Sequence, residues 1–348
     1  MKATTLGIDL AKSTFRLHGV DGRGVTVLRR QLTRKQLLPF LARLSPCTVG
    51  LEACAGAHYW ARELEKLGHN PKLMSPHFVA PYRKSQKNDG NDADAICEAV
   101  GRPSMRFVPV KNAAQQDVQA IHRIRFQLIK WRTALANQIR GLLGEYGIVI
   151  AKGIAPLRRE LPHILEDREE KLSGIFREML REMAERLTLL DQRIHHYDCM
   201  VERVFAQDER CQRLARVEGI GALAATALLA AVGNAHEFKN GRELSAWLGL
   251  VPRQYSSGGR NVLLGISKRG DRYLRTLLIH GARSAVRVVE RRRDPRSIAI
   301  SRLKARRGPN VAAVALANHN ARVLWALLTR GEEYRPRAAQ CTAVARSA

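Results

Sequence analysis

Four acidic residues in the first part of the chain stand where carboxylates can do chemistry. Asp9 ends the predicted strand TTLGIDLA, Glu52 ends the predicted strand CTVGLEAC, and Asp89 and Asp92 lie three residues apart in KNDGNDADAI. A carboxylate just inside an apolar strand is costly to bury unless it is paired or bound to a metal. Mg²⁺ prefers such oxygen ligands, and two ions can clamp the attacking and leaving oxygens of a phosphoryl transfer. The four acids therefore predict a site for Mg²⁺, with Mn²⁺ as an alternative.

Each of these acids also has an ordinary structural explanation. Asp89 or Asp92 could cap a helix, and Asp9 could simply end a strand. For any one acid alone the structural explanation is favoured, and for the four together the metal site is favoured. Asp94 lies outside the set and is interpreted as a surface residue.

The elements that must position these acids alternate in type over the first 110 residues. Short strands are predicted over 4–11, 14–20 and 24–32, then a helix over 33–44, a strand over 47–54, a helix over 57–68 and a strand over 70–76. A further helix is expected to begin near Asn91. A three-stranded meander followed by βαβ units predicts a mixed sheet with helices on its faces.

Two long helices follow, over about 112–146 and 176–204. The second carries apolar residues at alternating steps of four and three: Phe176, Leu180, Met183, Leu187, Leu190, Ile194, Tyr197, Val201 and Val204. A strict period of 3.5 residues keeps one stripe facing a partner helix, which is typical of a coiled coil. The partner is either a second copy of the chain, which the regular seam slightly favours, or the preceding helix in an antiparallel hairpin.

The last third of the chain has two features that suggest contact with phosphate. Gly219 and Gly221 lie between two helical stretches and resemble a helix-hairpin-helix, whose glycines let backbone N–H groups approach a phosphate. A plain tight turn between packed helices is the alternative. Residues 251–310 hold 16 Lys plus Arg against 3 Asp plus Glu, with few aromatic residues, so backbone contact is expected. The predicted contacts are Arg253, Lys268, Arg269, Arg272 and Arg275.

The composition agrees with a polyanionic partner. The chain has 59 Lys plus Arg against 32 Asp plus Glu and a net charge of +27, which favours nucleic acid, with an anionic membrane surface as the rival. The longest apolar run, Ala222 to Val232, is too short to span a bilayer, and no signal-like core begins the chain, so a cytoplasmic protein is expected. None of the six cysteines forms a C-x-x-C pair, which argues for free thiols and against zinc.

Six ordered motifs together resemble the DEDD insertion-sequence transposases of the IS110 family, in its IS1111 branch. They are GIDLAK, GLEACAG, KNDGNDADA, VEGIGALAATALLAAVG, WLGLVPRQYSSGGR and GISKRGDRYLRTLLIHGA, and the resemblance runs from Thr5 to about Gly331. It implies an α/β N-terminal domain of RNase H-like (RuvC-type) fold over 1–111, then long helices with a coiled coil over 112–205. A mainly α-helical C-terminal transposase domain over 206–331 and a basic tail over 332–348 would follow.

The resemblance also implies roles for residues and partners. The family's four metal-binding acids map onto Asp9, Glu52, Asp89 and Asp92. Its catalytic serine, which follows a PRxY segment, falls by spacing on Ser257, whereas Ser256 stands where relatives often carry an acid. Implied partners are donor and target DNA, a structured guide RNA encoded by the element, and further copies of the chain through the coiled coil, in the bacterial cytoplasm at the nucleoid.

Three other functions remain open from the sequence. A DNA invertase of the pilin-inversion type shares these motifs and this chemistry. A metal-dependent Holliday-junction nuclease would use the acids with water and without a serine. A non-enzymatic architectural DNA binder would need only the basic surface, and the four acids argue against it.

Overall fold

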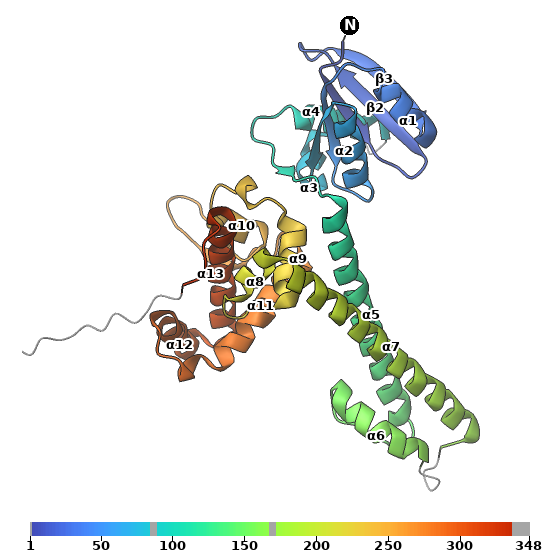
Figure 1. Cartoon of the computed structure of the whole chain (residues 1–348), viewed down its shortest axis with the longest axis vertical. Helices are drawn as coiled ribbons and strands as arrows, with labels where there is room; N and C mark the ends of the chain where they lie inside the picture. The colour runs from blue at the N-terminus through green and yellow to red at the C-terminus, as the bar shows by residue number, and fades with distance from the viewer. Residues whose placement is uncertain (1, 84–88, 167–171, 336–348) are drawn as a thin grey trace, which may run out of the picture. The chain divides into compact units, whose positions relative to one another are not determined.

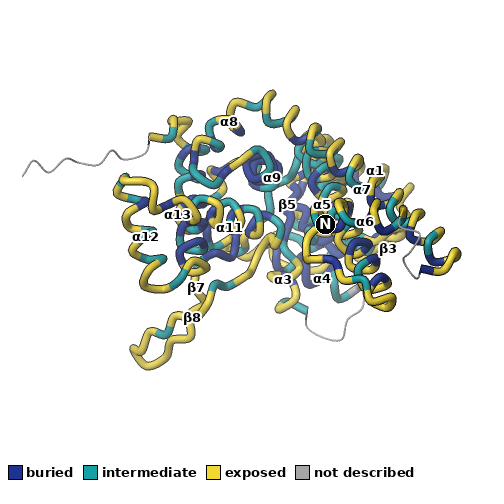
Figure 2. Tube along the Cα trace, turned by 90° about the horizontal axis from the view of Figure 1, so that it is seen from below, coloured by how far each residue is buried: buried dark blue, intermediate teal, exposed yellow. Residues whose placement is uncertain are grey.

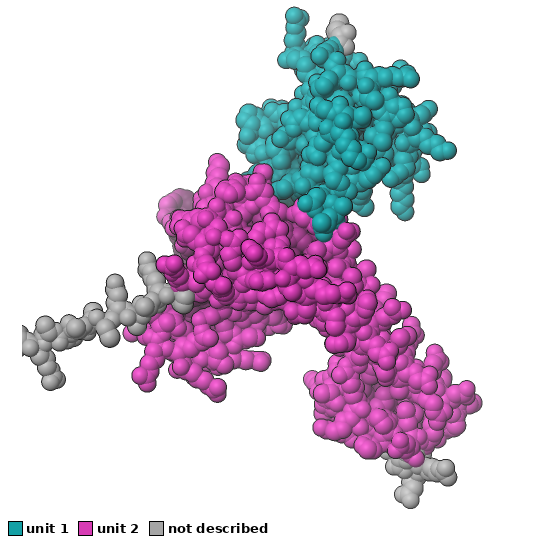
Figure 3. Space-filling model, in the orientation of Figure 1, with its two compact units in different colours: residues 1–114 teal, residues 115–348 magenta. Residues whose placement is uncertain are grey.

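The structure is a computed structural model that describes residues 2–83, 89–166 and 172–335, with Asp89 and Gly90 described by their backbone only. It divides into two compact units, unit 1 with residues 1–114 and unit 2 from residue 115 onward (Figure 3). The division falls close to the predicted boundary at residue 111. Unit 2 holds both the long helices and the C-terminal helices.

Unit 1 is built on a six-stranded sheet with the order β3-β2-β1-β4-β5-β6 (Figure 1). Its strands are β1 (Thr5–Asp9), β2 (Thr14–Val20), β3 (Thr26–Thr33), β4 (Thr48–Glu52), β5 (Asn70–Met74) and β6 (Phe107–Val108). The first three strands form an antiparallel meander, β1, β4 and β5 run parallel, and β6 pairs antiparallel with β5. The predicted mixed sheet is confirmed, and β6 is an addition that the sequence pattern does not predict.

Helices cover both faces of this sheet. They are α1 (Arg34–Leu41), α2 (Ala57–Lys66), α3 (Pro76–Val79), the 3₁₀ turn η1 (Ala80–Tyr82) and α4 (Asp89–Val100). Leu6 and Ile8 of β1 share a core with Trp60 of α2 and with residues of α1. Because side chains alternate between the faces of a strand, Gly7 and Asp9 must point to the opposite face. That second face is covered by α4, which contacts β1, β2 and β4.

Two glycines let α4 lie close to the sheet. A Cβ at Gly7 would lie 2.3 Å from the carbonyl oxygen of Ala93, and one at Gly50 would lie 2.9 Å from Cβ of Val100. The Cys97 thiol donates to the carbonyl oxygen of Thr5 at 3.7 Å. Thr5 lies two residues before Gly7 on β1, on the same face of the sheet. The helix therefore runs against β1, and its first turn is directed toward the end of β1 that carries Asp9.

The long helices of unit 2 are α5 (Ala113–Gly144), α6 (Ile154–Glu166) and α7 (Gly174–Gln207). Leu180 and Leu187 of the predicted seam share a core with Ile139 of α5 and with residues of α6. Further along, α5 and α7 are joined by the ion pairs Arg125–Asp198 and Arg132–Asp191.

The seam of α7 is thus filled within the chain. Phe176, Leu180, Leu187, Ile194 and Val201 are buried with no second copy present. Within one chain the seam packs against the preceding long helix, which was the alternative arrangement, and the association of two chains through it stays a prediction. The regular period shows that a partner helix exists, and it cannot say which helix that is.

The rest of unit 2 is a helical bundle with one exposed hairpin. Its elements are α8 (Glu209–Ala215), α9 (Ala222–Val232), η2 (Ala235–Glu237), α10 (Gly241–Trp247), β7 (Pro252–Gln254), β8 (Leu263–Ile266), α11 (Arg272–Arg287), η3 (Val289–Arg291), α12 (Pro295–Arg307) and α13 (Pro309–Arg330). Figure 2 shows α9 as a buried helix and the β7–β8 hairpin as an exposed projection.

Within the described residues, α13 is the one helix long and apolar enough to cross a membrane by length and composition. It packs against α10, α11 and α12, and its residues Leu316 and Leu324 are buried in the core of unit 2. Its apolar composition therefore has an explanation in the bundle.

The described cysteines are all free thiols. Cys47, Cys97 and Cys211 are buried as predicted, whereas Cys54 and Cys199 are exposed. Cys341 lies outside the described residues.

Candidate active site

Asp9 and Glu52 end neighbouring parallel strands on the same face of the sheet. Ile8 of β1 pairs with Leu51 of β4, so the two acids follow at the next position of each strand. Each acid lies two residues after a glycine that contacts α4, and residues two apart on a strand share a face. The structure therefore brings these two predicted residues together beneath the first turn of α4.

The electrostatics of a nearby thiol agree with this placement. Burial first, and then the negative charges of Glu52 and Asp9, raise the pKa of the Cys54 thiol. Both carboxylates therefore lie close enough to act on one sulfur atom. The raised pKa keeps Cys54 protonated at neutral pH, so it is no soft thiolate ligand beside the acids.

The other two predicted acids begin α4. Its backbone starts at Asp89, and Asp92 lies one turn before Ile96, which packs over Gly50. The Asp92 carboxylate accepts a hydrogen bond from Arg83 Nε at 2.5 Å and its side chain is 13% exposed. Asp92 is thus a half-buried, charge-paired residue near the strand ends.

The donor atoms of this arrangement suit a hard cation. Asp9, Glu52 and Asp92 offer only carboxylate oxygens, which suit Mg²⁺ or Mn²⁺ and not zinc. Within the described residues, no group of three or more His, Cys, Asp or Glu side chains is arranged to hold a metal ion. The side chain of Asp89 lies outside that set. The donor chemistry fits the ion, and Asp92 must exchange or share its arginine partner to bind it.

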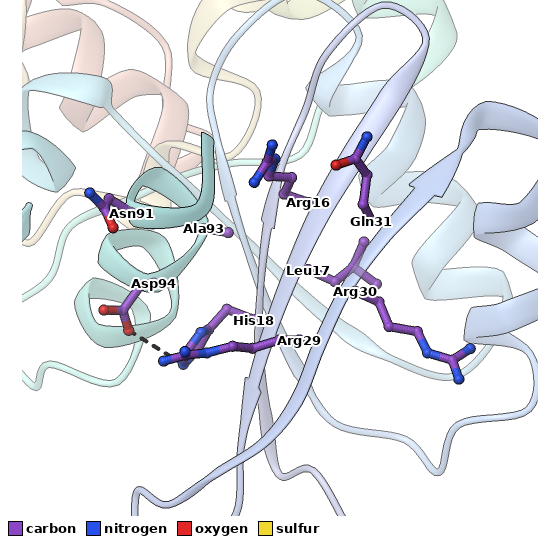
Figure 4. Close-up of a pocket in the computed structure, with 9 residues that line it drawn as sticks. All are labelled: Arg16, Leu17, His18, Arg29, Arg30, Gln31, Asn91, Ala93 and Asp94. Atoms are coloured by element: carbon purple, nitrogen blue, oxygen red, sulfur yellow. Dashed lines mark ion pairs between the residues drawn. The ribbon is translucent and has the colours of Figure 1, made fainter. Parts of the chain in front are cut away.

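Asp94 has a more specific place than the surface position expected for it. Its carboxylate lies 3.3 Å from Nε2 of His18 on β2, and His18 is 4% exposed. Both residues line a cleft of about 350 Å³ between the meander and α4 (Figure 4). The sequence holds no local signal for this pair, because the two residues are brought together only by the packing of α4 on the sheet.

The two candidate serines lie in the loop of the β7–β8 hairpin in unit 2, and their hydroxyl groups differ. Ser256 Oγ accepts a hydrogen bond from the backbone N–H of Val262 at 3.3 Å, which closes the loop. Ser257 forms an isolated bridge with Arg260 through its backbone. Its own hydroxyl makes no hydrogen bond to any residue that the structure describes. Tyr255, beside them, is 76% exposed.

Four of the five predicted phosphate contacts are exposed. Arg253 lies on β7, Lys268 and Arg269 lie in the turn between β8 and α11, and Arg272 begins α11. Lys268 adopts φ = 55°, which is uncommon for a residue with a side chain. The turn that holds it is tightly packed, since a Cβ at Gly270 would lie 1.8 Å from the carbonyl oxygen of Trp247.

The prediction for Arg275 is wrong. It is 8% exposed, and its Nη1 donates to the backbone carbonyls of Leu248 and Arg269, each at 3.2 Å. Arg275 lies on the inner face of α11, so it holds the base of the hairpin against the bundle. Helical spacing placed it near the exposed cations, but it could not say which face of the helix is buried.

The two glycines of the helix-hairpin-helix-like turn have different surroundings. Gly219 has φ = +81°, and a Cβ there would lie 2.6 Å from the carbonyl oxygen of Gly281 on α11. It serves close helix packing, which was the alternative explanation. Gly221 precedes α9 and has open space at its Cβ position.

A buried polar group in unit 2 was missed by sequence reasoning. His122 of α5 is 3% exposed and lies 3.0 Å from both the Tyr273 hydroxyl and Thr226 Oγ1. Burial, and then the charge of Arg125, lowers the pKa of His122 to about 4. The only sequence signal is a histidine on the apolar side of a predicted helix, which is weak.

Comparison with known proteins covers both units. Residues 6–148 match a DEDD-type IS110 family profile described as "Transposase". Residues 211–296 match a profile described as "Transposase IS116/IS110/IS902 family".

Curated relatives match over almost the whole chain. A "Probable family 20 transposase" of Pseudomonas aeruginosa is 51% identical over 97% of this chain and 100% of its own length. The "Transposase for insertion sequence element IS1111A" of Coxiella burnetii is 48% identical over 95% of this chain and 91% of its own length. The "Transposase for insertion sequence element IS1328" of Yersinia enterocolitica is 41% identical over 94% of this chain and 97% of its own length.

Proposed function

Because the chain belongs to the IS116/IS110/IS902 family of transposases, we propose that it cleaves and rejoins DNA strands through Ser257 and a carboxylate-bound divalent metal. The observation that carries the proposal is the placement of Asp9 and Glu52. They end adjacent parallel strands beneath a helix that begins at Asp89.

The proposed fold of unit 1 is RNase H-like, of the RuvC type. An antiparallel meander, two further parallel strands and helices on both faces support it. In this arrangement the acids are held by regular elements, which position side chains more rigidly than loops do.

Asp9, Glu52, Asp89 and Asp92 are the proposed ligands of Mg²⁺, with Mn²⁺ as an alternative. The bound ion would polarise the scissile phosphate and stabilise the negative charge that develops on its oxygens. Asp9 and Glu52 hold their oxygens at neighbouring strand ends. Arg83 holds the Asp92 carboxylate, and a bound ion would compete with it for that carboxylate.

Ser257 is the proposed nucleophile. Its Oγ forms a bond to phosphorus as a phosphorus–oxygen bond to deoxyribose breaks. The hydroxyl proton leaves to solvent, and the departing deoxyribose oxygen takes up a proton. Attack by a deoxyribose hydroxyl on the phosphoserine then rejoins a strand and restores Ser257. Ser256 is the less suitable candidate, because its Oγ is engaged with Val262.

The proposed partners are donor and target DNA and a structured guide RNA, in the bacterial cytoplasm at the nucleoid. The exposed cations Arg253, Lys268, Arg269 and Arg272 support contact with a nucleic-acid backbone, together with the net charge of +27. The guide RNA rests on the family resemblance alone.

The test is a covalent adduct. With DNA carrying the element's ends and Mg²⁺, we expect a protein–DNA species that survives SDS and disappears on protease treatment. Ser257→Ala should abolish it, and the matched neighbour Ser256→Ala should retain it. Tyr255→Phe, another exposed hydroxyl of the same loop, should also retain it.

The opposite results have definite meanings. Loss of the adduct in Ser256→Ala alone would move the nucleophile by one residue. Normal strand cleavage by Ser257→Ala, with loss in Asp9→Asn, would make water the nucleophile, as in a junction nuclease.

A further inference from the structure

The cleft in unit 1 extends the row of residues that contains the acids. In the register of the meander, Asp9 pairs with Arg16 and Arg16 pairs with Gln31. One row earlier, Gly7 pairs with His18 and His18 pairs with Arg29. Directly paired residues share a face of the sheet, so all of them lie on the face that carries the acids and α4.

The lining of this cleft is suited to an anion. Arg16 and Arg29 contribute guanidinium groups, and Gln31 and Asn91 contribute amides. Among the described lining residues the one carboxylate is Asp94, which lies 3.3 Å from Nε2 of His18. Guanidinium and amide groups are the usual donors to phosphate oxygens.

The neighbouring Arg30 points its guanidinium to the other face of the sheet, unlike Arg29. Arg30 lies between Arg29 and Gln31 in the sequence, and its guanidinium lies over the Phe40 ring, 5.3 Å from the centroid. Figure 4 shows the Arg29 side chain extending toward α4 and the Arg30 side chain pointing away from it. Alternation along β3 therefore separates two adjacent cations onto opposite faces.

We propose that this cleft binds a backbone phosphate of the DNA strand that is cleaved, beside the scissile phosphate. Arg16 is one strand from Asp9, about 5 Å at the usual strand spacing, and Arg29 is two strands across and two residues along, about 12 Å. The bound phosphate therefore lies within a few nucleotides of the cut.

Such a site has a clear purpose beside the acids. Carboxylates repel a DNA strand, and a neighbouring cationic cleft offsets that repulsion and sets the register of the strand. The inference rests on the proposed function, because it assigns the occupant as the strand that the acids act on. Arg16, Arg29, Gln31 and Asn91 are positioning residues in this scheme.

The test is binding of a fluorescein-labelled single-stranded DNA of about 20 nucleotides to the full chain in EDTA, followed by anisotropy across a salt series. Each phosphate contact on a single strand contributes about 0.7 to the salt slope. Arg16→Gln/Arg29→Gln should lower the slope by about 0.7, because the cleft takes one phosphate, and weaken binding about fourfold near physiological salt. Arg29→Gln alone should lower it by about half as much.

A charge-matched control is available in the same unit. Arg34→Gln/Lys35→Gln removes two exposed cations of α1 that are not among the cleft's lining residues, and Arg34 lies over the Trp60 ring, 5.0 Å from the centroid. This control should leave the salt slope unchanged. Equal losses in both double variants would mean a general charge effect and would overturn the proposal.

The remaining outcomes separate this inference from the proposed function. If the wild-type chain binds DNA as described but never cleaves it, the proposed function fails and the cleft stands as a DNA site. If the chain cleaves DNA and the cleft variant binds and cleaves normally, the cleft proposal fails alone. A loss seen only with RNA of the same length would assign the cleft to RNA and overturn the proposal.

Discussion

Arg83 Nε lies 2.5 Å from Asp92 Oδ1, so one of the proposed metal ligands is already held by a cation of the chain. The pair ties the segment after η1 to the first turn of α4. An ion that binds Asp92 must compete with this guanidinium. The pair orients the carboxylate when no ion is bound.

Removing this competitor should tighten metal binding. Arg83→Gln deletes one positive charge a few ångströms from the site, which for a divalent ion is roughly 2 kcal/mol at high effective dielectric and about thirtyfold in affinity. Isothermal titration with Mn²⁺ measures it without any cleavage.

A charge-matched control lies at the other end of the same helix. Arg102 pairs with Glu98 at 2.5 Å, and Arg102→Gln should leave the affinity unchanged. Weaker metal binding in Arg83→Gln would mean that Arg83 orients Asp92 for the ion, contrary to the competition described.

Gly7 should be intolerant of a methyl group. Its added Cβ would lie 2.3 Å from the Ala93 carbonyl, so α4 must shift away from β1. We expect Gly7→Ala to lower the free energy of unfolding by about 1–3 kcal/mol and to abolish DNA cleavage. Gly22, in the β2–β3 turn, has open space at its Cβ position, and Gly22→Ala should change neither. Cleavage at the wild-type rate by Gly7→Ala would mean that activity does not require α4 to pack closely on β1.

The buried His122 should make unit 2 sensitive to acid. Its pKa is lowered from 6.5 to about 4, so the unfolded chain binds its proton first as the pH falls. The neutral native form is fully favoured above pH 6.5, and that stability is lost between pH 6.5 and about 4. The loss amounts to about 3 kcal/mol by linkage.

Urea unfolding across this pH range measures the effect. His122→Asn should show a shallower decline, by up to about 1.4 kcal/mol per pH unit. An identical decline in wild type and variant would exclude His122 as the origin of the acid sensitivity.

The seam of α7 should support the fold of a single chain. Leu187 is 2% exposed in the hairpin core, and Leu187→Ala should lower the free energy of unfolding by about 2–5 kcal/mol. Leu189 on the same helix is 54% exposed, and Leu189→Ala should have little effect. The mass of the particle by light scattering should not change in either variant. A lower particle mass for Leu187→Ala would mean that the seam joins two chains.

Local patterns predicted the elements of unit 1 well. The meander, the two βαβ steps and the glycine-bounded helix α2 follow from short-range alternation and turn residues. The start of α4 was predicted near Asn91 and lies at Asp89. Asp9 and Glu52 could be placed at strand ends because parallel strands bring their ends to one edge of the sheet.

The sequence by itself therefore determined the element types, the strand-end acids and the family to which the motifs point. Tertiary packing alone decided which faces are covered. It put Arg275 inside and Arg272 outside, filled the α7 seam with α5, and turned Gly219 toward α11. It also set Arg16 and Arg29 beside the acids while Arg30 faces α1. The physical reason is that periodicity records which residues share a face, whereas the partner of that face is chosen by contacts between residues far apart in the chain.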